Sequence, residues 1–227
     1  MLEAPRPAAI FRLEGGLAPL GTVPAPAYFG LQQGDAGARM WRLGSVLAGL
    51  GARVASPLGS GDAAERLAWS ALRGLSEDRI AVLGEEYARA EVLPRVRAAG
   101  LELALAARRA GFRIVLWSDW IHAIVDPVAA HLGADTVVAN TPLFADGRAT
   151  GRIGEPVVAA TSARWLQAWA KGESLVLGAS RAYGALGSDA FLMQTIATLG
   201  GEVCALHPDW RLRRLAGDQG WPIVDAR

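Results

Sequence analysis

The order of apolar runs along the chain constrains its fold more strongly than any other feature of the sequence. A short apolar run, AAIF at residues 8–11, precedes a long stretch, residues 27–110, that is rich in Ala, Leu and Arg and is predicted to be almost all helical. The next run, FRIVLW at residues 112–117, is continuous and apolar, as in a strand covered on both faces. Beyond it, strand-like and helix-like segments alternate. This order predicts a mostly parallel sheet with helices on both faces and a helical insertion after the first strand.

Local signals define the expected elements of the alternating region. Gly133 ends one predicted helix, and Asp146-Gly147 is a typical turn pair for a predicted hairpin over residues 141–153. Ser76 is the expected N-cap of a helix inside the insertion. Further strands are expected at residues 135–140, 174–178, 202–206 and 222–225, and helices at residues 121–133, 161–172, 189–201 and 209–220.

The length of the chain, 227 residues, suits one domain with an inserted subdomain. We therefore expect an α/β fold in which residues 1–26 and 111–227 form a three-layer, Rossmann-like core with a parallel sheet. Residues 27–110 are expected to form a helical cap inserted after the first strand.

Composition and charge argue against several classes of protein. Hydrophobic residues make up 52% of the chain and charged residues 20%, which is typical of a globular protein. The formal net charge of +1 provides no general attraction to nucleic acid or to anionic membranes. No apolar stretch reaches the ~18 residues that a membrane span needs, and the first residues lack the apolar segment of a secretory signal. Because Cys204 is the single cysteine, no internal disulfide is possible, and we expect a cytoplasmic protein.

Three short segments follow predicted strands at the sheet edge where open α/β folds bind ligands. They are RLEGG at residues 12–16, WSD at residues 117–119 and GAS at residues 178–180. Within the first segment, Arg12 and Glu14 are two residues apart and project to the same side of an extended chain. These segments form the candidate functional site.

Three longer segments resemble the haloacid dehalogenase superfamily, specifically its phosphoserine-phosphatase-like branch. ALRGLSEDRIAVLGEEYARAEVLPRV resembles the cap helices of that branch, and GFRIVLWSDWIHAIVDPVAAHLGADTVVANTPLFADGRATGRI resembles its second-strand region. LHPDWRLRRLAGDQGWPIVD resembles its C-terminal end. The segments occur in the right order and extend the resemblance over nearly the whole chain. The resemblance implies the same α/β core with a helical cap.

The resemblance also implies a mechanism. Such enzymes end the first strand with Asp-x-Asp-x-Thr, whose first Asp attacks phosphorus and whose second is a general acid and base. A Ser or Thr after the second strand and a downstream Lys hold the phosphate, and an acidic pair after the fourth strand helps to bind Mg²⁺. The covalent intermediate divides one difficult step into two, and Mg²⁺ stabilises charge in the transition state.

Most of these roles lack a suitable side chain in this sequence. The position of the nucleophile is Arg12, that of the acid and base is Glu14, and that of the threonine is Gly16. The phosphate-binding serine matches Ser118. The downstream lysine is absent, because Lys171, the single lysine of the chain, lies at the end of a predicted helix.

The acidic pair is altered as well. Its opening Gly-Asp falls on Gly178-Ala179, which removes the first carboxylate. The following segment looks longer than that of the family, and Asp189 is the best candidate for the second acid. The extra residues, 183–187, are compatible with a lid, an interface or a loose loop.

The loss of four separate roles indicates a catalytically inactive member of the family, a pseudophosphatase. Arginine stays protonated and has no usable lone pair. Its fixed charge also opposes Mg²⁺, since two unit charges ~4 Å apart interact by about 4 kcal/mol at an effective dielectric of 20. We therefore expect no metal or other cofactor, with Mg²⁺ needed only if the protein is an active phosphatase.

Three interpretations of the altered site stay open. In the first, Arg12 pairs with Glu14 or Asp189 and fills an inactive pocket. In the second, the site holds a phosphate or a carboxylate without metal. In the third, Glu14, Asp119 or Ser118 supports residual catalysis in a new role. The anion-binding residues of the second interpretation are Arg12, Gly15, Ser118 and Ser180.

These interpretations imply different partners. A non-catalytic protein would bind another protein or a small anion through the former cleft and the cap, and an Arg12→Ala variant should then fold and show altered binding. The alternative is a Mg²⁺-dependent phosphomonoester phosphatase with displaced catalytic residues. A further possibility is an assembly subunit with an exposed apolar cap surface. No nucleic-acid partner is expected.

The aromatic residues near the site have a structural interpretation. Trp117 and Trp120 flank Ser118, and packing beneath the cap is favoured over a role in a ligand pocket. Trp165 and Trp169 share one face of a predicted helix and are expected in the core. No metal role is expected for the histidines, which lack the spacing of metal ligands: His122, His131 and His207.

Overall fold

The computed structural model describes residues 4–21, 24–32, 40, 44, 46–48, 66–154, 157 and 163–225. Most of residues 33–65, which belong to the predicted cap, lie outside this described part. Among the described helices, none combines the length and the apolar character needed to cross a membrane.

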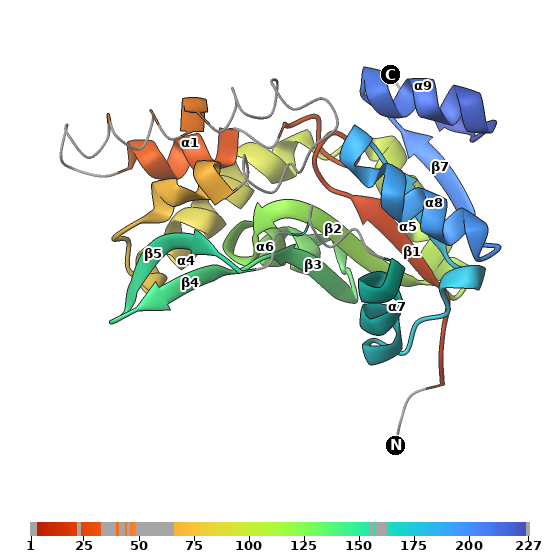
Figure 1. Cartoon of the computed structure of the whole chain (residues 1–227), viewed down its shortest axis with the longest axis horizontal. Coiled ribbons are helices and arrows are strands. Elements are labelled where there is room, and N and C mark those ends of the chain that lie inside the picture. Colours follow the sequence, from red (N-terminus) through yellow and green to blue (C-terminus); the bar gives the residue numbers. More distant parts are fainter. Residues whose placement is uncertain are drawn as a thin grey trace.

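The core of the molecule is a six-stranded sheet (Figure 1). Its strands are β1 (Ala8–Arg12), β2 (Arg113–Ile121), β3 (Thr136–Asn140), β6 (Arg181–Gly184), β7 (Glu202–Leu206) and β8 (Ile223–Val224). Their order is β3-β2-β1-β6-β7-β8, and each neighbouring pair runs parallel. Because β1 lies between β2 and β6, its carboxyl end meets those of both neighbours at one edge of the sheet.

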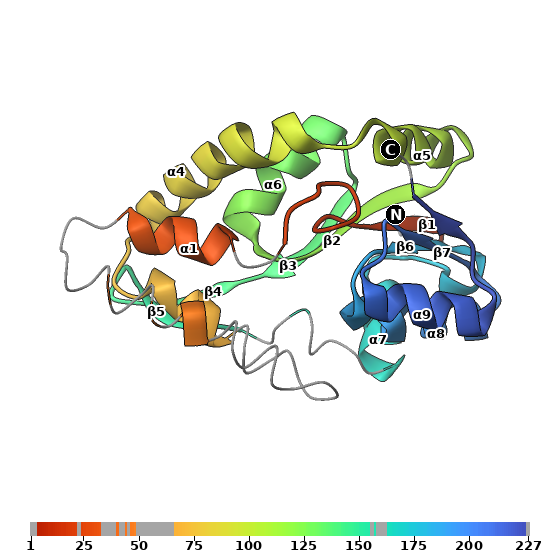
Figure 2. The ribbon, with the colours of Figure 1, turned by 90° about the horizontal axis from the view of Figure 1, so that it is seen from above.

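Helices cover both faces of the sheet because the side chains of each strand alternate between the two faces. Along β1, Ala9 and Phe11 belong to one apolar cluster, whereas Ala8 and Ile10 belong to the other. Figure 2 shows helices on the two opposite sides of the sheet. The first face carries α5 (Ala98–Arg109) and α6 (His122–Leu132), and the second carries α7 (Ala163–Gly172), α8 (Ala190–Thr198) and α9 (Trp210–Gln219). The predicted three-layer α/β fold is confirmed.

A second group of elements lies at one end of the molecule (Figure 2). It contains α1 (Pro24–Leu31), α4 (Glu77–Tyr87) and the antiparallel hairpin of β4 (Pro142–Ala145) and β5 (Arg148–Ile153). As predicted, Ser76 caps α4, its side chain accepting a hydrogen bond from the backbone N–H of Arg79. The hairpin turns at Asp146 and Gly147, whose φ angles of 51° and 71° suit a tight two-residue turn.

The helix α4 packs closely on α6, which belongs to the core. Gly84 of α4 faces the carbonyl group of Ala123 in α6, and a Cβ atom at residue 84 would lie too close to that oxygen. Glycine therefore allows the two helices to approach each other. The last helix of the predicted cap segment, α5, packs instead on β1 and β2.

One predicted strand, residues 174–178, is wrong. Leu177–Ala179 form a single 3₁₀ turn, and the fourth strand of the sheet is β6, which begins only at Arg181. The apolar side chains of Leu175 and Leu177 are buried without strand pairing of the predicted kind. A short apolar run fixes burial but does not distinguish a strand from a turn. The fourth strand therefore ends at Gly184, and not at residue 178 as predicted.

Candidate functional site

Buried polar side chains gather at the edge of the sheet where β1, β2 and β6 end. Arg12 is the last residue of β1, and Ser118 and Asp119 lie in the extended second half of β2. The side chains of the cluster are at most 2% exposed, and they belong to Arg12, Glu14, Ser118, Asp119 and Asp189. Unpaired charges are rarely tolerated at such burial, so the partners of each side chain determine what the site can do.

Arg12 lies between three buried carboxylates. Its Nε atom is 3.1 Å from Oε2 of Glu14, and its Nη1 atom is 3.1 Å from Oδ1 of Asp119. Nη2 contacts Oδ2 of Asp119, which makes that pair bidentate. Nη1 also lies 3.3 Å from Oδ1 of Asp189. Burial opposes the charge of Arg12, but the three carboxylates outweigh it and raise the pKa of the guanidinium, so Arg12 stays charged.

Glu14 uses its second oxygen for a different set of contacts. Oε1 accepts hydrogen bonds from Oγ of Ser118 at 2.8 Å, from the backbone N–H of Asp119 at 2.9 Å and from that of Trp120 at 3.0 Å. Burial raises the pKa of Glu14, and the nearby Arg12 opposes that shift. One carboxylate thus joins the arginine to the three donors of β2.

Asp189 reaches the cluster from the loop after β6. Its Oδ2 atom accepts hydrogen bonds at 2.8 Å from the backbone N–H groups of Ala185 and Leu186. Burial raises the pKa of Asp189, against the opposing effect of Arg12. The segment 183–187, whose role the sequence left undefined, ends β6 and packs Ala185 and Leu186 near Gly15.

The loop after β1 is tightly constrained. Gly15 has a φ of 75°, and Arg97 donates hydrogen bonds to the carbonyl groups of Gly15 and Gly16, the latter at 2.8 Å. A Cβ atom at residue 16 would lie too close to the carbonyl oxygen of Arg12. Glycine at residue 16, where the family resemblance implies a threonine, is therefore required by this loop conformation.

Aromatic residues separate the cluster from solvent. Trp69 donates a hydrogen bond through Nε1 to the carbonyl group of Asp119 at 3.2 Å, and Asn140 donates to the same oxygen. Trp120 is fully buried and meets the ring of Tyr87 from α4, with ring centroids 5.8 Å apart. Packing of Trp120 beneath the cap segment was predicted and is found.

Trp117 does not share that environment. Its ring packs on the opposite face of the sheet, with centroids 6.1 Å from Trp165 and 5.9 Å from Trp169 of α7. The prediction that it packs beneath the cap is wrong, because alternate residues of a strand face opposite sides of a sheet. Trp165 and Trp169 stack on one helix face, as expected, but both are only half-buried.

The predicted residues Ala179 and Ser180 do not belong to this cluster. Oγ of Ser180 accepts a hydrogen bond from the backbone N–H of Ala8 at 2.9 Å, at the beginning of β1. Arg12 is four residues further along β1, about 13 Å away at the rise of a strand. The error follows from the misplaced fourth strand, since Ala185 and Asp189, rather than Ala179, follow its true end. Ser180 therefore does not contribute to an anion site around Arg12.

The sequence interpretation missed three contributors. Asn140 ends β3 at the same edge of the sheet, and the rule that selected Arg12 and Ser118 would have selected it too. Trp69 and Arg97 come from the predicted cap segment. No local sequence signal predicts that their side chains reach the edge of the sheet.

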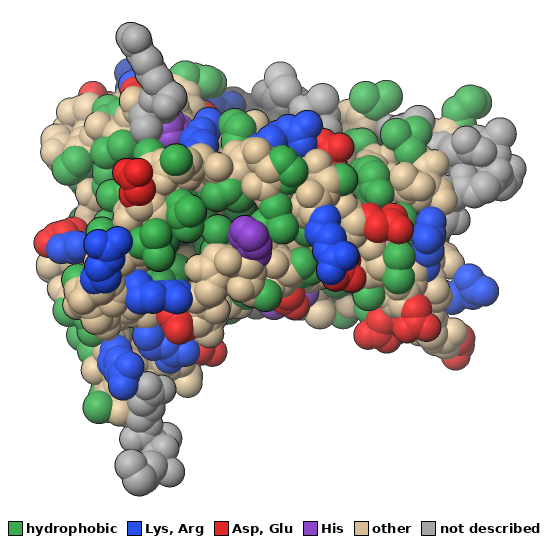
Figure 3. All heavy atoms as spheres, turned by 180° about the vertical axis from the view of Figure 1, so that it is seen from behind, with side chains coloured by type: hydrophobic (Ala, Val, Ile, Leu, Met, Phe, Trp, Pro, Cys, Tyr) green, Lys and Arg blue, Asp and Glu red, His purple; other side chains and the backbone are tan. Residues whose placement is uncertain are grey.

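Within the described residues, no group of three or more His, Cys, Asp or Glu side chains is arranged to hold a metal ion. The three carboxylates of the cluster surround a guanidinium instead. On the face shown in Figure 3, basic and acidic side chains stand beside each other, which gives that face a mixed charge.

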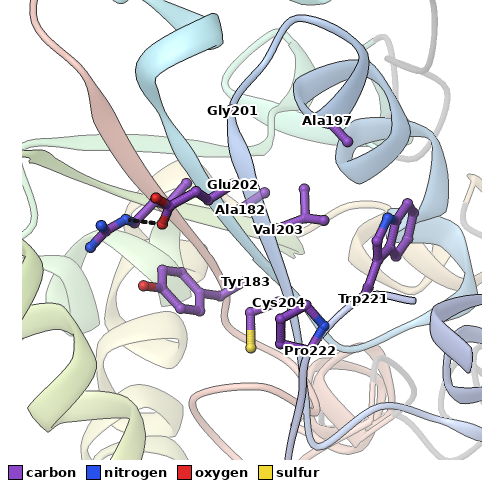
Figure 4. Close-up of a pocket in the computed structure, with 10 residues that line it drawn as sticks. Ala182, Tyr183, Ala197, Gly201, Glu202, Val203, Cys204, Trp221 and Pro222 are labelled. Atoms are coloured by element: carbon purple, nitrogen blue, oxygen red, sulfur yellow. Dashed lines mark ion pairs between the residues drawn. The ribbon is translucent and has the colours of Figure 1, made fainter. Parts of the chain in front are cut away.

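A separate pocket of about 440 Å³ lies beside β6 and β7 (Figure 4). An ion pair of 2.6 Å joins Arg181 to Glu202 at one side, and Trp221 and Pro222 line another. Burial raises the pKa of the Cys204 thiol, which disfavours a reactive thiolate. No residue of the Arg12 cluster lines this pocket.

A family model described as haloacid dehalogenase-like hydrolase matches residues 23–193, more than half of the chain. The chain belongs to the haloacid dehalogenase-like hydrolase family. The resemblance noted in the sequence is thereby confirmed. The match to the family model begins after residues 12–16.

Curated relatives of this haloacid dehalogenase-like chain include proteins named as phosphatases. Phosphoserine phosphatase SerB1 of Mycobacterium tuberculosis (strain ATCC 25618 / H37Rv) is 29% identical over 166 residues, which are 73% of this chain and 53% of that protein. The "Inhibition of morphological differentiation protein" of Streptomyces azureus is 32% identical over 117 residues, 51% of this chain and 41% of that protein. The chain thus spans about half the length of the curated relatives that it matches.

Solved structures share the haloacid dehalogenase-like fold. A protein of unknown function from Bordetella pertussis Tohama I superposes with a TM-score of 0.80 at 24% identity, covering 98% of this chain and 99% of that chain. A structure described as a phospho-aspartyl intermediate analogue of phosphoserine phosphatase superposes with a TM-score of 0.65 at 16% identity. The superposition covers 99% of this chain and 95% of that chain. At these identities the likeness supports the fold alone.

Proposed function

We propose that the protein is a non-catalytic member of its family, a pseudophosphatase that acts by binding a partner protein or a small anion. The observation that carries this proposal is the position of Arg12. It ends β1, where the family resemblance implies a nucleophilic carboxylate, and three buried carboxylates hold it there.

The chemistry of Arg12 argues against covalent phosphoryl transfer at this position. A nucleophile needs an available lone pair, which a guanidinium lacks. The ion pairs with Glu14, Asp119 and Asp189 raise the pKa of Arg12, so deprotonation does not supply one. A phosphoryl group would therefore find no acceptor at the end of β1.

The carboxylates do not fit a bound Mg²⁺ in this arrangement. Hard oxygen ligands are present, but the oxygens of Glu14, Asp119 and Asp189 face the same guanidinium. A dication among these oxygens would have to compete with the fixed charge of Arg12 for the same carboxylates. We propose that the protein works without Mg²⁺.

Burial of the cluster argues against turnover of a phosphate ester at this site. Arg12 and Asp119 are at most 2% exposed, and the indole of Trp69 bonds to the backbone of Asp119. A phosphate ester would have to displace these contacts before it reached Ser118.

A second candidate function is a phosphomonoester phosphatase with displaced catalytic residues. Two observations favour it: several relatives are named as phosphatases, and the carboxylate of Glu14 accepts a hydrogen bond from Ser118. In that case Glu14, hydrogen-bonded to Ser118, would be the first residue to test for acid and base chemistry.

Hydrolysis of an aryl phosphate separates the two functions. The purified chain is assayed with p-nitrophenyl phosphate with and without Mg²⁺, beside a Ser118→Ala variant whose circular dichroism confirms folding. The proposal predicts no turnover above that of the variant. Turnover that requires both Mg²⁺ and Ser118 would overturn it and establish the phosphatase.

A further inference from the structure

Three hydrogen-bond donors of β2 converge on a single oxygen atom. The hydroxyl of Ser118 and the backbone N–H groups of Asp119 and Trp120 all lie within 3.0 Å of Oε1 of Glu14. Ser118, Asp119 and Trp120 are at most 1% exposed, so water does not compete for these donors. We call these three donors the β2 cradle.

The β2 cradle has the character of an oxyanion site. Hydrogen bonds to an ionised acceptor are roughly twice as strong as those between neutral groups, and buried donors left without an acceptor are costly. The donors are fixed by the backbone of β2 and by the side chain of Ser118, which itself contacts the N–H of Trp120 at 3.0 Å. Their arrangement therefore persists whatever anion lies in front of them.

We propose that Glu14 is an intramolecular ligand that occupies this oxyanion site, and that removing its carboxylate opens the site to a small, singly charged oxyanion. This inference rests on the proposed function and narrows it: because a carboxylate of the chain itself fills the site, the native chain acts by binding a partner protein and not a free small anion. A carboxylate such as acetate and dihydrogen phosphate share the required chemistry. The cradle then holds an external oxygen in place of Oε1.

The charges of the cluster determine the preference for a single negative charge. Arg12 supplies the one positive charge, and Asp119 and Asp189 supply negative charges beside it. A monoanion that replaces Glu14 leaves this balance unchanged. A dianion adds a further negative charge in a buried site, which is unfavourable.

The loop that carries Glu14 is fixed to the rest of the fold. Arg97, which precedes α5, donates to the carbonyl groups of Gly15 and Gly16, directly after Glu14. A ligand held on such a short tether acts at an effective concentration of millimolar or more. The wild-type chain should therefore bind free phosphate only weakly.

The test measures thermal unfolding of the full chain against increasing phosphate at constant ionic strength, with chloride as the balancing salt. The proteins are wild type, Glu14→Ala, Glu14→Gln and the double variant Glu14→Ala/Ser118→Ala. We expect a saturable rise of the unfolding temperature in Glu14→Ala, with an affinity about 100-fold above that of wild type. Glu14→Gln, which still fills the cradle, and the double variant should not show it.

Three outcomes would overturn the inference. They are a folded Glu14→Ala variant without a saturable response, an equal response in wild type, and an equal response in the double variant. If Glu14→Ala does not fold alone, refolding with acetate or phosphate should restore its circular dichroism, and failure of both anions would equally overturn the inference.

Thermal unfolding in phosphate does not measure catalysis. A failure of this inference can therefore be distinguished from a failure of the proposed function. Turnover by the wild-type chain would overturn the pseudophosphatase but not the occupancy of the cradle by Glu14. Absent phosphate binding in folded Glu14→Ala would overturn the occupancy while leaving the pseudophosphatase intact.

Discussion

Arg12 and Asp119 form a bidentate ion pair across the ends of β1 and β2, with Nη1 of the arginine 3.1 Å from Oδ1 of the aspartate. The pair is buried, and its geometry fixes the two strand ends relative to each other. Its removal should therefore affect the folded state as a whole rather than a single surface.

Arg12→Ala should destabilise the protein by about 3–5 kcal/mol, because it leaves three buried carboxylates without their cation. From the sequence alone this variant was expected to fold normally, and the buried pairs of Arg12 reverse that expectation. Urea unfolding measures the change. The matched control is Arg89→Ala, which removes an exposed pair with Glu85 and should change stability by less than about 1 kcal/mol. Similar losses in both variants would contradict the prediction.

Stability should depend on pH through Asp189. Burial raises the pKa of this carboxyl in the folded state, so the folded chain binds the proton more tightly than the unfolded chain does. The contribution of Asp189 is therefore present at low pH and is lost as pH rises from the unfolded pKa through the raised folded pKa. Urea midpoints of wild type and Asp189→Asn across that range should show wild type losing stability relative to the variant as pH increases. If the urea midpoints of the two proteins changed with pH in parallel, the pH dependence could not be assigned to Asp189.

Gly16→Ala should destabilise the chain by about 1–3 kcal/mol, because the Cβ of the alanine would overlap the backbone oxygen of Arg12. Gly217→Ala in α9 is the control, since open space surrounds that position and alanine favours a helix by about 1 kcal/mol. Thermal unfolding should thus move in opposite directions for the two variants. A neutral Gly16→Ala would mean that the loop after β1 adopts another conformation.

Trp69→Phe should lower stability by about 1–3 kcal/mol, since the buried carbonyl of Asp119 loses one of its two donors. The control is Trp210→Phe, because Trp210 is 70% exposed and its replacement should be close to neutral. Chemical unfolding of both variants, followed by circular dichroism, provides the comparison. Equal stabilities would indicate that Trp69 does not close the cluster.

The sequence predicted the strands that carry most of the site. β1, β2 and β3 have strong apolar runs, so Arg12, Glu14 and Ser118 were placed correctly at one sheet edge. β6 was missed because it is only four residues long, RAYG, and alternates half-buried with buried positions. That single error displaced Ala179 and Ser180 to the wrong end of the sheet.

Other features of the site could not have been predicted from a pattern. The convergence of two backbone N–H groups on Glu14 depends on the direction of peptide groups in β2, which residue types do not encode. The contacts of Trp69 and Arg97 depend on how the segment before α5 returns to the sheet. Asp189 was proposed from the family resemblance, as the second acid of the acidic pair, and it reaches Arg12 through a loop whose length has no periodic signal.

The close approach of α4 and α6 at Gly84 also determines how quickly the interior can be reached. Two helices in direct backbone contact do not part by a loop movement of nanoseconds to microseconds. Their separation is a local unfolding event, with a free energy that hydrogen exchange can measure. The amides of Asp119 and Trp120 should consequently exchange with solvent as slowly as those of the central strand β1, and the buried ions should keep their partners between such openings.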